Sequence, residues 1–101
     1  MNARTEVDIV ALTRGGSQLG ERLQNRLADS VLYVPAKFFP EVEGAPRTFP
    51  YEDLKSLVGR LFVPDRGLVF IMATGIVVRL ISPHLKGKRQ DPGVVVLDEE
   101  G

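Results

Sequence analysis

Residues 68–82 read LVFIMATGIVVRLIS: an apolar run, a turn at Ala73-Thr74-Gly75 and a second apolar run. The first run is short, apolar throughout and bounded by turn residues, which is typical of a strand buried on both faces. The second run is long enough for a short helix, which Thr74 is positioned to cap. This stretch therefore predicts a buried strand that leads directly into a helix, the repeating unit of parallel sheets.

The rest of the chain repeats this alternation. In 17–29 leucines recur every four residues, and in 54–62 apolar residues follow helical spacing, so both segments are predicted helices, the first capped by Ser17 or Gly16. Short apolar runs predict further strands at 7–12, 31–34 and 94–97. We therefore predict that residues 1–101 form a single α/β domain with three layers, αβα, and a short, mainly parallel four-stranded sheet.

Residues 35–50 interrupt the alternation with four prolines. Because proline cannot continue a helix or a central strand, this segment is predicted to be a long loop. Phe38, Phe39 and Phe49 lie in it, and leaving such rings in water is costly. Two interpretations remain open: the loop is a lid or wall for a substrate, or its rings cover the edge of the core.

The composition excludes several classes of protein. The chain has no cysteine and a single histidine, His84, which excludes disulfides, a thiol nucleophile and thiolate or multi-histidine metal sites, so we expect no metal or cofactor of its own. Thirteen Lys and Arg balance thirteen Asp and Glu, which argues against nucleic acid and anionic membranes as partners. No apolar run is long enough to span a bilayer, and the first residues contain no apolar signal core. We therefore expect a cytoplasmic protein.

All strands of a parallel sheet end at one edge, where open α/β proteins bind their ligands. The turn Thr13-Arg14-Gly15-Gly16 follows the first predicted strand, and backbone amides at the start of the next helix predict an anion site there. The alternative is a tight turn with Arg14 in solvent. The turn lacks the third glycine of a dinucleotide-binding motif, and the chain has no P-loop.

A second corner follows the strand at 68–72. Gly75 permits a ligand to approach the backbone, and Arg79, one helical turn later, is a candidate partner for a carboxylate. The alternative is that Thr74 and Gly75 make only the turn while Arg79 pairs with a local acid.

Residues 66–91 carry a local excess of positive charge. Five basic residues face a single acid in this range: Arg66, Arg79, Lys86, Lys88 and Arg89 against Asp91. The excess predicts a patch that receives a polyanion, and the alternative is an ordinary solvated face. His84 and Asp91 are the nearby candidates for a general base, with His84 interpreted mainly as an exposed loop residue.

Residues 68–101 resemble the N-terminal domain of the cobalt-precorrin-5A hydrolase (CbiG) family of anaerobic cobalamin biosynthesis. The likeness rests on Ala73 to Arg79, Pro83, Lys88 and the run from Asp91-Pro92 to Glu99. The opening VDIVALTRGGSQLGERL is similar to the first strand and helix of the same domain, with matches at Thr13, Arg14 and Gly15. The resemblance thus covers nearly the whole chain.

The resemblance implies hydrolytic opening of the δ-lactone of cobalt-precorrin 5A, with release of acetaldehyde. It implies a cobalt-corrinoid precursor as partner, so that cobalt belongs to the substrate. The substrate-binding residues that it implies are Thr13, Arg14, Gly15, Gly16, Thr74, Gly75, Arg79 and Lys88. In this interpretation the Thr74 and Gly75 amides stabilise the oxyanion, Phe38 and Phe39 face the macrocycle, and Asp91 is the candidate base.

Members of this family continue into a linker and a C-terminal domain, which are absent from these residues. The remaining domains of the same enzyme are therefore expected partners. A second interpretation is a non-catalytic binding or assembly module that recognises a polycarboxylate tetrapyrrole. A homo-oligomer is a further alternative, and an FMN carrier would rest on fold analogy alone.

Overall fold

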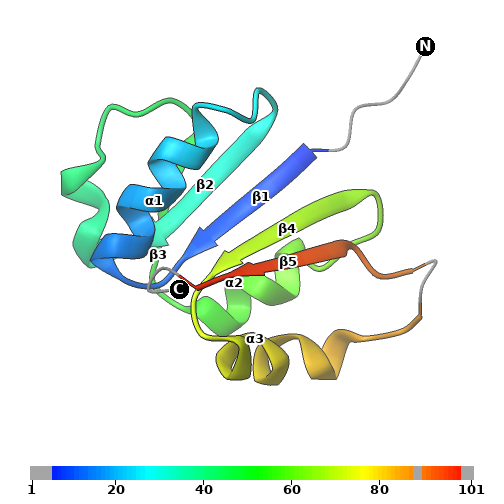
Figure 1. Cartoon of the computed structure of the whole chain (residues 1–101). Helices are drawn as coiled ribbons and strands as arrows, with labels where there is room; N and C mark the ends of the chain where they lie inside the picture. Colours follow the sequence, from blue (N-terminus) through cyan, green and yellow to red (C-terminus); the bar gives the residue numbers. More distant parts are fainter. Residues whose placement is uncertain (1–5, 88–89, 99–101) are drawn as a thin grey trace, which may run out of the picture.

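The computed structural model describes residues 6–87 and 90–98 (Figure 1). Along the chain its elements are β1 (Glu6–Ala11), α1 (Arg14–Gln24), β2 (Ser30–Pro35), the 3₁₀ helix η1 (Ala36–Glu41), β3 (Thr48–Tyr51), α2 (Leu54–Leu61), β4 (Arg66–Ile71), α3 (Thr74–Ile81), the 3₁₀ helix η2 (Ser82–His84) and β5 (Gly93–Leu97). The strands form one sheet in the order β3-β2-β1-β4-β5, and all neighbours are parallel. The predicted α/β class with a parallel sheet is confirmed.

The sheet has five strands instead of the predicted four. The additional strand, β3, lies in the proline-rich segment that was expected to be a loop, and it pairs with β2 from Leu32↔Thr48 to Pro35↔Tyr51. Proline is compatible with β3 because an edge strand has one neighbour and leaves half of its N–H groups unpaired. The prolines of this segment therefore exclude a central strand but not an edge strand.

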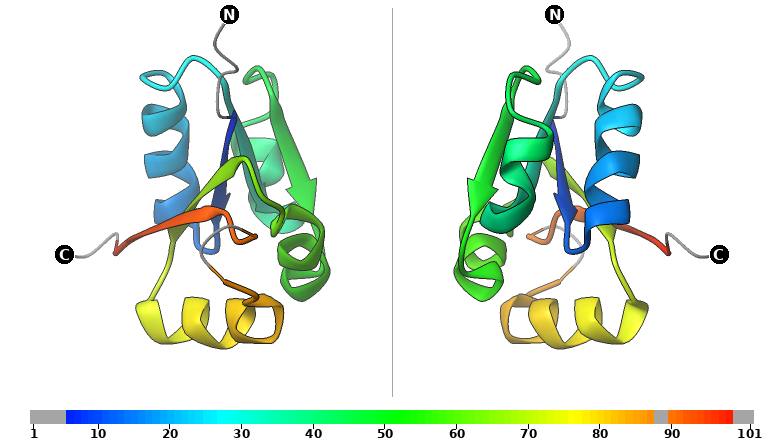
Figure 2. Two further views of the ribbon diagram at one scale, coloured as in Figure 1. Left: turned by 90° about the vertical axis from the view of Figure 1, so that its right-hand side faces the viewer. Right: turned by 90° about the vertical axis from the view of Figure 1, so that its left-hand side faces the viewer.

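Helices cover both faces of the sheet and make the three predicted layers (Figure 2). On one face, α1 and η1 pack against the core side chains of the central strands, chiefly Ile9, Leu32, Val34 and Ile71. On the other face, α2 and α3 insert Leu57, Val58, Leu61 and Val77 against Val10, Leu68 and Phe70. Each face thus has its own apolar core, and the sheet between them is held in place from both sides.

The strand order reverses next to β1. The chain runs outward from β1 through β2 to β3, and then returns to place β4 on the other side of β1, with β5 beyond it. β1 and β4 are in register up to Ala11↔Ile71, so both strands end together. A reversal of this kind sends the two following loops to opposite faces, and open α/β sheets bind ligands in the crevice between such loops.

Two glycines allow α1 to lie close to the sheet. A Cβ atom on Gly20 would lie 2.6 Å from Cδ1 of Leu32, and one on Gly16 would lie 3.3 Å from the carbonyl oxygen of Ile71. A larger residue at either position would push the helix away from β2 or β4. The glycines at the start of α1 therefore serve helix packing, and Gly16 brings the first corner into contact with the end of β4.

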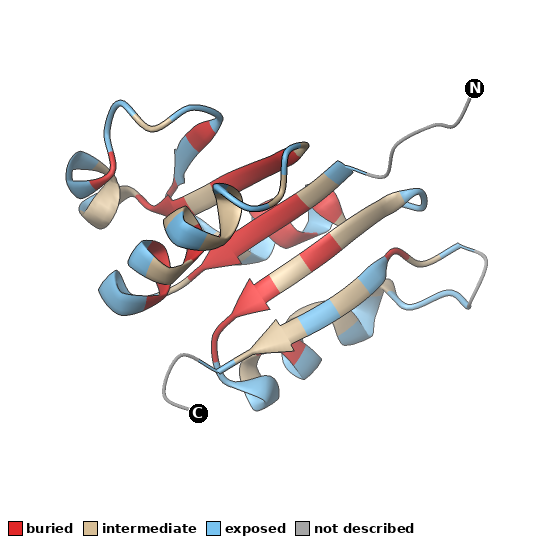
Figure 3. Cartoon of the chain, turned by 45° about the horizontal axis from the view of Figure 1, so that its top comes forward, coloured by how far each residue is buried: buried red, intermediate tan, exposed pale blue. Residues whose placement is uncertain are grey.

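Helix α1 covers β1, β2 and the end of β4 but leaves the same face open over β5 (Figure 3). Val95 of β5 remains 52% exposed there. The buried part of the sheet is therefore formed mainly by β1, β2 and β4.

Candidate functional site

The first corner is the turn from β1 into α1. Thr13 caps the helix: its side-chain oxygen accepts a hydrogen bond from the Gly16 amide at 2.9 Å, and its carbonyl accepts one from the Ser17 amide at 2.8 Å. The predicted caps, Ser17 and Gly16, are wrong because α1 begins earlier, at Arg14. The Gly16 amide is thus already engaged. The amides of Arg14 and Gly15 are those that helix geometry leaves without an intrahelical acceptor.

The second corner is the turn from β4 into α3. The helix begins at Thr74, its N-cap is Ala73, and no side chain caps it, so the predicted capping role of Thr74 is wrong. The first intrahelical donors are the amides of Ile76 and Val77, which bond the Ala73 carbonyl at 3.1 and 3.3 Å. The preceding amides of Thr74 and Gly75 therefore lack an intrahelical acceptor, and both residues are exposed.

The structure confirms that the two corners share one edge of the sheet. They follow adjacent parallel strands that end in register, and Gly16 contacts Ile71 directly. Each corner contributes the positive end of a helix dipole and backbone donors, an arrangement that suits an anionic ligand. Arg79 lies exposed in the last turn of α3 and makes no ion pair among the described residues.

Two cations flank Phe38 beside the first corner. The guanidinium of Arg14 lies 5.1 Å and the ammonium of Lys37 lies 5.2 Å from the ring centroid. Arg14 also pairs with Glu41 of η1, its Nε lying 3.0 Å from one carboxylate oxygen. Because this pair is largely exposed, its net stabilisation is small, and a ligand carboxylate can compete for the remaining donors of Arg14.

The phenylalanines of 35–50 do not act together as the predicted wall. Phe39 packs against the core on the α1 face, whereas Phe38 contacts the two cations. Phe49 is 50% exposed, and its ring centroid lies 6.1 Å from that of Tyr33. Both rings are half-buried and contact different partners, so the expectation that Phe38 and Phe39 jointly face a macrocycle stays a prediction that this arrangement does not favour.

An apolar cavity of about 390 Å³ opens at the same edge, beyond the first corner. Its lining comes from the ends of three strands and the start of α2, and includes Leu12, Pro35, Lys37, Tyr51, Glu52 and Leu54. The Tyr51 hydroxyl donates a hydrogen bond to the Ala11 carbonyl at 2.5 Å, which ties the end of β3 to the end of β1. No feature of the sequence indicated this cavity, since its lining depends on where β3 pairs.

Tyr51 gives the domain an expected sensitivity to alkaline pH. Burial raises the pKa of Tyr51 to about 12, above the value of about 10 for an unfolded chain. The neutral phenol is thus favoured by folding, so its stabilisation is complete below about pH 10 and is lost as the pH rises toward about 12.

The variant Tyr51→Phe tests this dependence. At pH 8 it should be about 1 to 3 kcal/mol less stable, because the buried Ala11 carbonyl loses its donor. Between pH 10 and 12 it should lose less stability than the wild type, with a residual slope from Tyr33, whose pKa is also raised by burial. Urea unfolding at a series of pH values measures both effects. Equal stability at pH 8 together with equal slopes would contradict the role of Tyr51.

Asp91 lies away from the two corners. It precedes β5, at the edge where the strands begin, and its carboxylate accepts hydrogen bonds from the amides of Lys86 and Gly87 at 2.9 and 3.2 Å. The length of β5 alone separates it from the other edge by roughly 15 Å. Asp91 therefore closes a turn in this structure, and its role as a base stays a prediction that the geometry does not support.

The predicted basic patch is described only in part, because Lys88 and Arg89 lie outside the described residues. Arg66 pairs with the buried Asp8, Arg79 lies on α3, and Lys86 lies near the turn that Asp91 closes. His84 is partly buried and not simply exposed, with its ring centroid 5.8 Å from that of Phe62. Among the described residues, one cation of this charge excess, Arg66, is thus already paired with a buried carboxylate.

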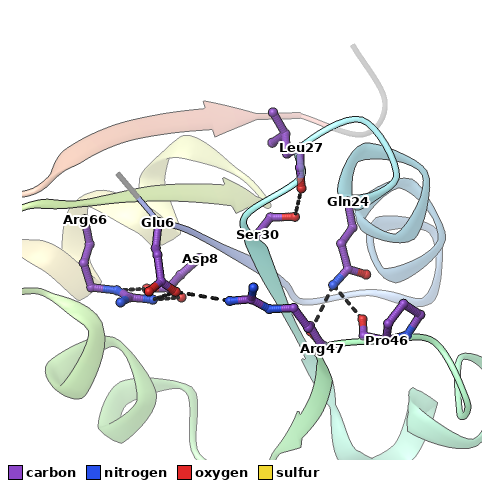
Figure 4. A network of polar contacts seen from close by, with 8 residues as sticks. All are labelled: Glu6, Asp8, Gln24, Leu27, Ser30, Pro46, Arg47 and Arg66. Atoms are coloured by element: carbon purple, nitrogen blue, oxygen red, sulfur yellow. Dashed lines mark hydrogen bonds and ion pairs between the residues drawn. The ribbon is translucent and has the colours of Figure 1, made fainter. Parts of the chain in front are cut away.

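A buried ion pair at the opposite edge was missed by the sequence analysis (Figure 4). Asp8 of β1 is fully buried, and its two oxygens accept hydrogen bonds from Nε and Nη2 of Arg66, both at 2.6 Å. The hydrogen bond to Asp8 raises the pKa of Arg66. Glu6 and Arg47 extend the network, with an Arg47–Glu6 distance of 3.1 Å. The signal in the sequence was an aspartate inside an apolar strand, which requires a partner.

The described residues contain no group of three or more His, Cys, Asp or Glu side chains arranged to hold a metal ion. None of their helices combines the length and apolarity required to cross a membrane.

Comparisons with known proteins show what the sequence is similar to. The family model "Cobalamin synthesis G N-terminal" (CbiG_N) matches residues 56–101. Two curated relatives are both described as cobalt-precorrin-5A hydrolase. The one from Priestia megaterium is 33% identical over 97% of this chain, and the one from Salmonella typhimurium is 33% identical over 94%. The chain spans 26% of the length of each relative. No solved structure matches it.

Fold and site together define a small doubly wound α/β domain with two helix starts at the edge where its strand order reverses. The resemblance predicted from the sequence is confirmed: residues 56–101 match the CbiG N-terminal family model, and nearly the whole chain is similar to two cobalt-precorrin-5A hydrolases.

Proposed function

We propose that this domain binds a carboxylate-bearing cobalt-corrinoid precursor in cobalamin biosynthesis, at the edge formed by the two corners. The observation that carries the proposal is the juxtaposition of two helix starts after β1 and β4, whose first amides have no intrahelical acceptor. Such donors fit carboxylates, and Arg14 and Lys37 add positive charge beside them. In this proposal, cobalt is part of the substrate.

The finer proposal is the reaction named for the curated relatives, hydrolysis of cobalt-precorrin 5A. Water would add to the carbonyl of the δ-lactone and the ring C–O bond would break, which gives a carboxylate and a free alcohol. The C–C bond between the macrocycle and the two-carbon unit that bears this alcohol would then break: the hydroxyl proton would leave, the unit would depart as acetaldehyde, and the electron pair of the C–C bond would stay on the macrocycle. The Thr74 and Gly75 amides are suited to stabilise the oxyanion that forms at the carbonyl. Because Asp91 lies at the opposite edge, the proton acceptor would come from outside the corners, and other domains of the same enzyme are the proposed source.

A second candidate function is binding without turnover. It is favoured by the position of Asp91, since the predicted base lies at the opposite edge and the Glu41 carboxylate beside the first corner is already paired with Arg14. The two functions are separated by incubating the chain with cobalt-precorrin 5A. Spectral perturbation of the corrinoid with acetaldehyde supports catalysis, whereas perturbation without acetaldehyde supports the binding module. The full-length Priestia megaterium enzyme serves as the positive control, and no perturbation at all would contradict both functions.

The variant Gly75→Ala tests the second corner. A Cβ atom there would meet nothing within 4 Å, and alanine is favoured over glycine in a helix, so stability should be unchanged or raised by up to about 1 kcal/mol. A methyl group at this point should nevertheless obstruct a ligand that approaches the amides, and we expect corrinoid affinity to fall by about tenfold or more.

The control for this variant is Gly93→Ala at the start of β5. Its Cβ would also meet nothing within 4 Å, but it lies at the opposite edge of the sheet. Absorbance titrations of both variants with the corrinoid measure the difference. Equal affinities would show that the ligand does not approach the backbone at Gly75.

A further inference from the structure

The cavity of about 390 Å³ beside the first corner has the properties of a separate ligand compartment. Its volume falls within the range of roughly 300 to 1,000 Å³ that is usual for small-molecule pockets. It is built on the ends of β1, β2 and β3 and the start of α2, so regular secondary structure holds its walls. Neither corner residue Thr74 nor Gly75 lines it, and it is therefore distinct from the crevice between β1 and β4.

The walls of this cavity are mainly apolar. Leu12, Pro35 and Leu54 contribute aliphatic surface, and Tyr51 contributes a ring whose hydroxyl is already engaged by the Ala11 carbonyl. Since burial holds the Tyr51 pKa near 12, the phenol stays neutral at physiological pH. These surfaces suit a flat apolar group that stacks or packs against them without requiring hydrogen bonds.

Two charged residues of the lining limit how many carboxylates a bound apolar group can carry. The Lys37 ammonium lies 5.2 Å from the Phe38 ring centroid but makes no ion pair among the described residues, whereas its neighbour Arg14 is paired with Glu41. Because a ring contact leaves its charge unneutralised, Lys37, which lines the cavity, is available to a carboxylate there. Glu52 lines the same cavity and would repel a second carboxylate. The lining thus combines one attractive and one repulsive charge for an anion.

We infer that this cavity is a subsite for a flat apolar group that bears a single carboxylate, with Lys37 as the partner of that carboxylate and Glu52 as the residue that excludes a second one. The inference rests on the proposed function where the group belongs to the corrinoid, as one ring edge with one acidic arm. The remaining arms would then lie toward the two corners. The subsite would distinguish macrocycles whose carboxylates are arranged differently. The corner amides by themselves would not make this distinction.

The first test uses small probes that contain no corrinoid. Backbone chemical shifts in ¹H–¹⁵N spectra of the wild-type chain are followed during titration with 2-naphthoate, neutral 2-naphthalenemethanol and 2,6-naphthalenedicarboxylate. We expect 2-naphthoate to shift residues that line the cavity, such as Leu12 and Leu54, and to bind at least fivefold more tightly than the other two. Shifts confined to other parts of the chain, or equal affinity for the three probes, would overturn the inference.

Two variants with opposite expected effects make the test specific. Lys37→Gln should weaken 2-naphthoate binding by at least fivefold, and Glu52→Gln should strengthen it and admit the dicarboxylate. Lys55→Gln is the matched control, because Lys55 is an exposed lysine of α2 that lines a different cavity. If Lys37→Gln and Lys55→Gln have the same effect, Lys37 is not the partner of the carboxylate.

Titration of the same variants with the corrinoid separates this inference from the proposed function. Naphthoate binding in the cavity without corrinoid binding would contradict the proposed function and would support the cavity as a site for an aromatic acid. Corrinoid binding that Lys37→Gln leaves unchanged, with no naphthoate in the cavity, would overturn the subsite alone. Weakening of both ligands by Lys37→Gln supports the two together.

Discussion

Replacement of Arg66 by methionine is expected to lower the free energy of unfolding by about 3 to 5 kcal/mol, because it leaves the carboxylate of Asp8 buried without a partner. Asp8 is 0% exposed, and both of its oxygens depend on the guanidinium of Arg66 at 2.6 Å. Methionine preserves the length of the side chain, so lost packing contributes little. Urea unfolding monitored by circular dichroism measures the change.

Two further variants separate the buried pair from ordinary surface charge. Arg47→Met removes the exposed partner of Glu6 and should cost less than about 1 kcal/mol. The double variant Asp8→Leu with Arg66→Met removes both buried charges and should recover most of the lost stability, since apolar replacements of buried ion pairs are often neutral or better. If Arg66→Met is no more destabilising than Arg47→Met, Asp8 is not held by Arg66.

The second large effect is expected for Leu57→Ala, with a loss of about 2 to 5 kcal/mol. Leu57 is 1% exposed and belongs to the core between α2 and the sheet, so truncation leaves a cavity that fixed neighbours cannot fill. Arg60→Ala on the exposed side of the same helix is the control and should change stability by less than about 0.5 kcal/mol. A thermal melt of Leu57→Ala that matches the melt of the control would show that Leu57 does not contribute to the core.

These two variants also bear on the site, because neither residue lies at the two corners. The folded fraction of each variant should bind the corrinoid with unchanged affinity. Gly75→Ala should show the reverse, with stability retained and affinity reduced. This contrast separates residues that maintain the fold from residues that contact the ligand.

Much of the fold could be predicted because it depends on local patterns. The apolar run at 68–72 and the helical spacing of 54–62 became β4 and α2 with small changes in their bounds. The prediction failed at β3, where Thr48–Tyr51 pairs with β2 although Pro50 lies within the strand and Pro46 just before it. Pairing at a sheet edge depends on a neighbouring strand, so a local pattern of turn residues does not reveal it.

Part of the candidate site could be predicted for the same reason. Parallel strands end at one edge, and the turns after Ala11 and Ile71 were therefore expected to lie together, as they do. The helix caps were not predicted correctly, because Thr13 at the first corner and Ala73 at the second are decided by where the chain enters each helix. The cavity lined by Lys37 and Glu52 joins residues from three strand ends, and no single stretch of sequence contains it.

By itself, the sequence determined the alternation of strands and helices, the two glycine-bearing corners and the family resemblance. Each of these depends on short contiguous runs of residues. Only the tertiary structure decided that Arg66 neutralises Asp8, that β3 completes the sheet, and that Asp91 lies at the edge opposite the corners. The physical reason is that these features depend on strand order and on crossovers between distant segments. Periodicity in a sequence reports the burial of each segment, but it carries no information about which segments become neighbours.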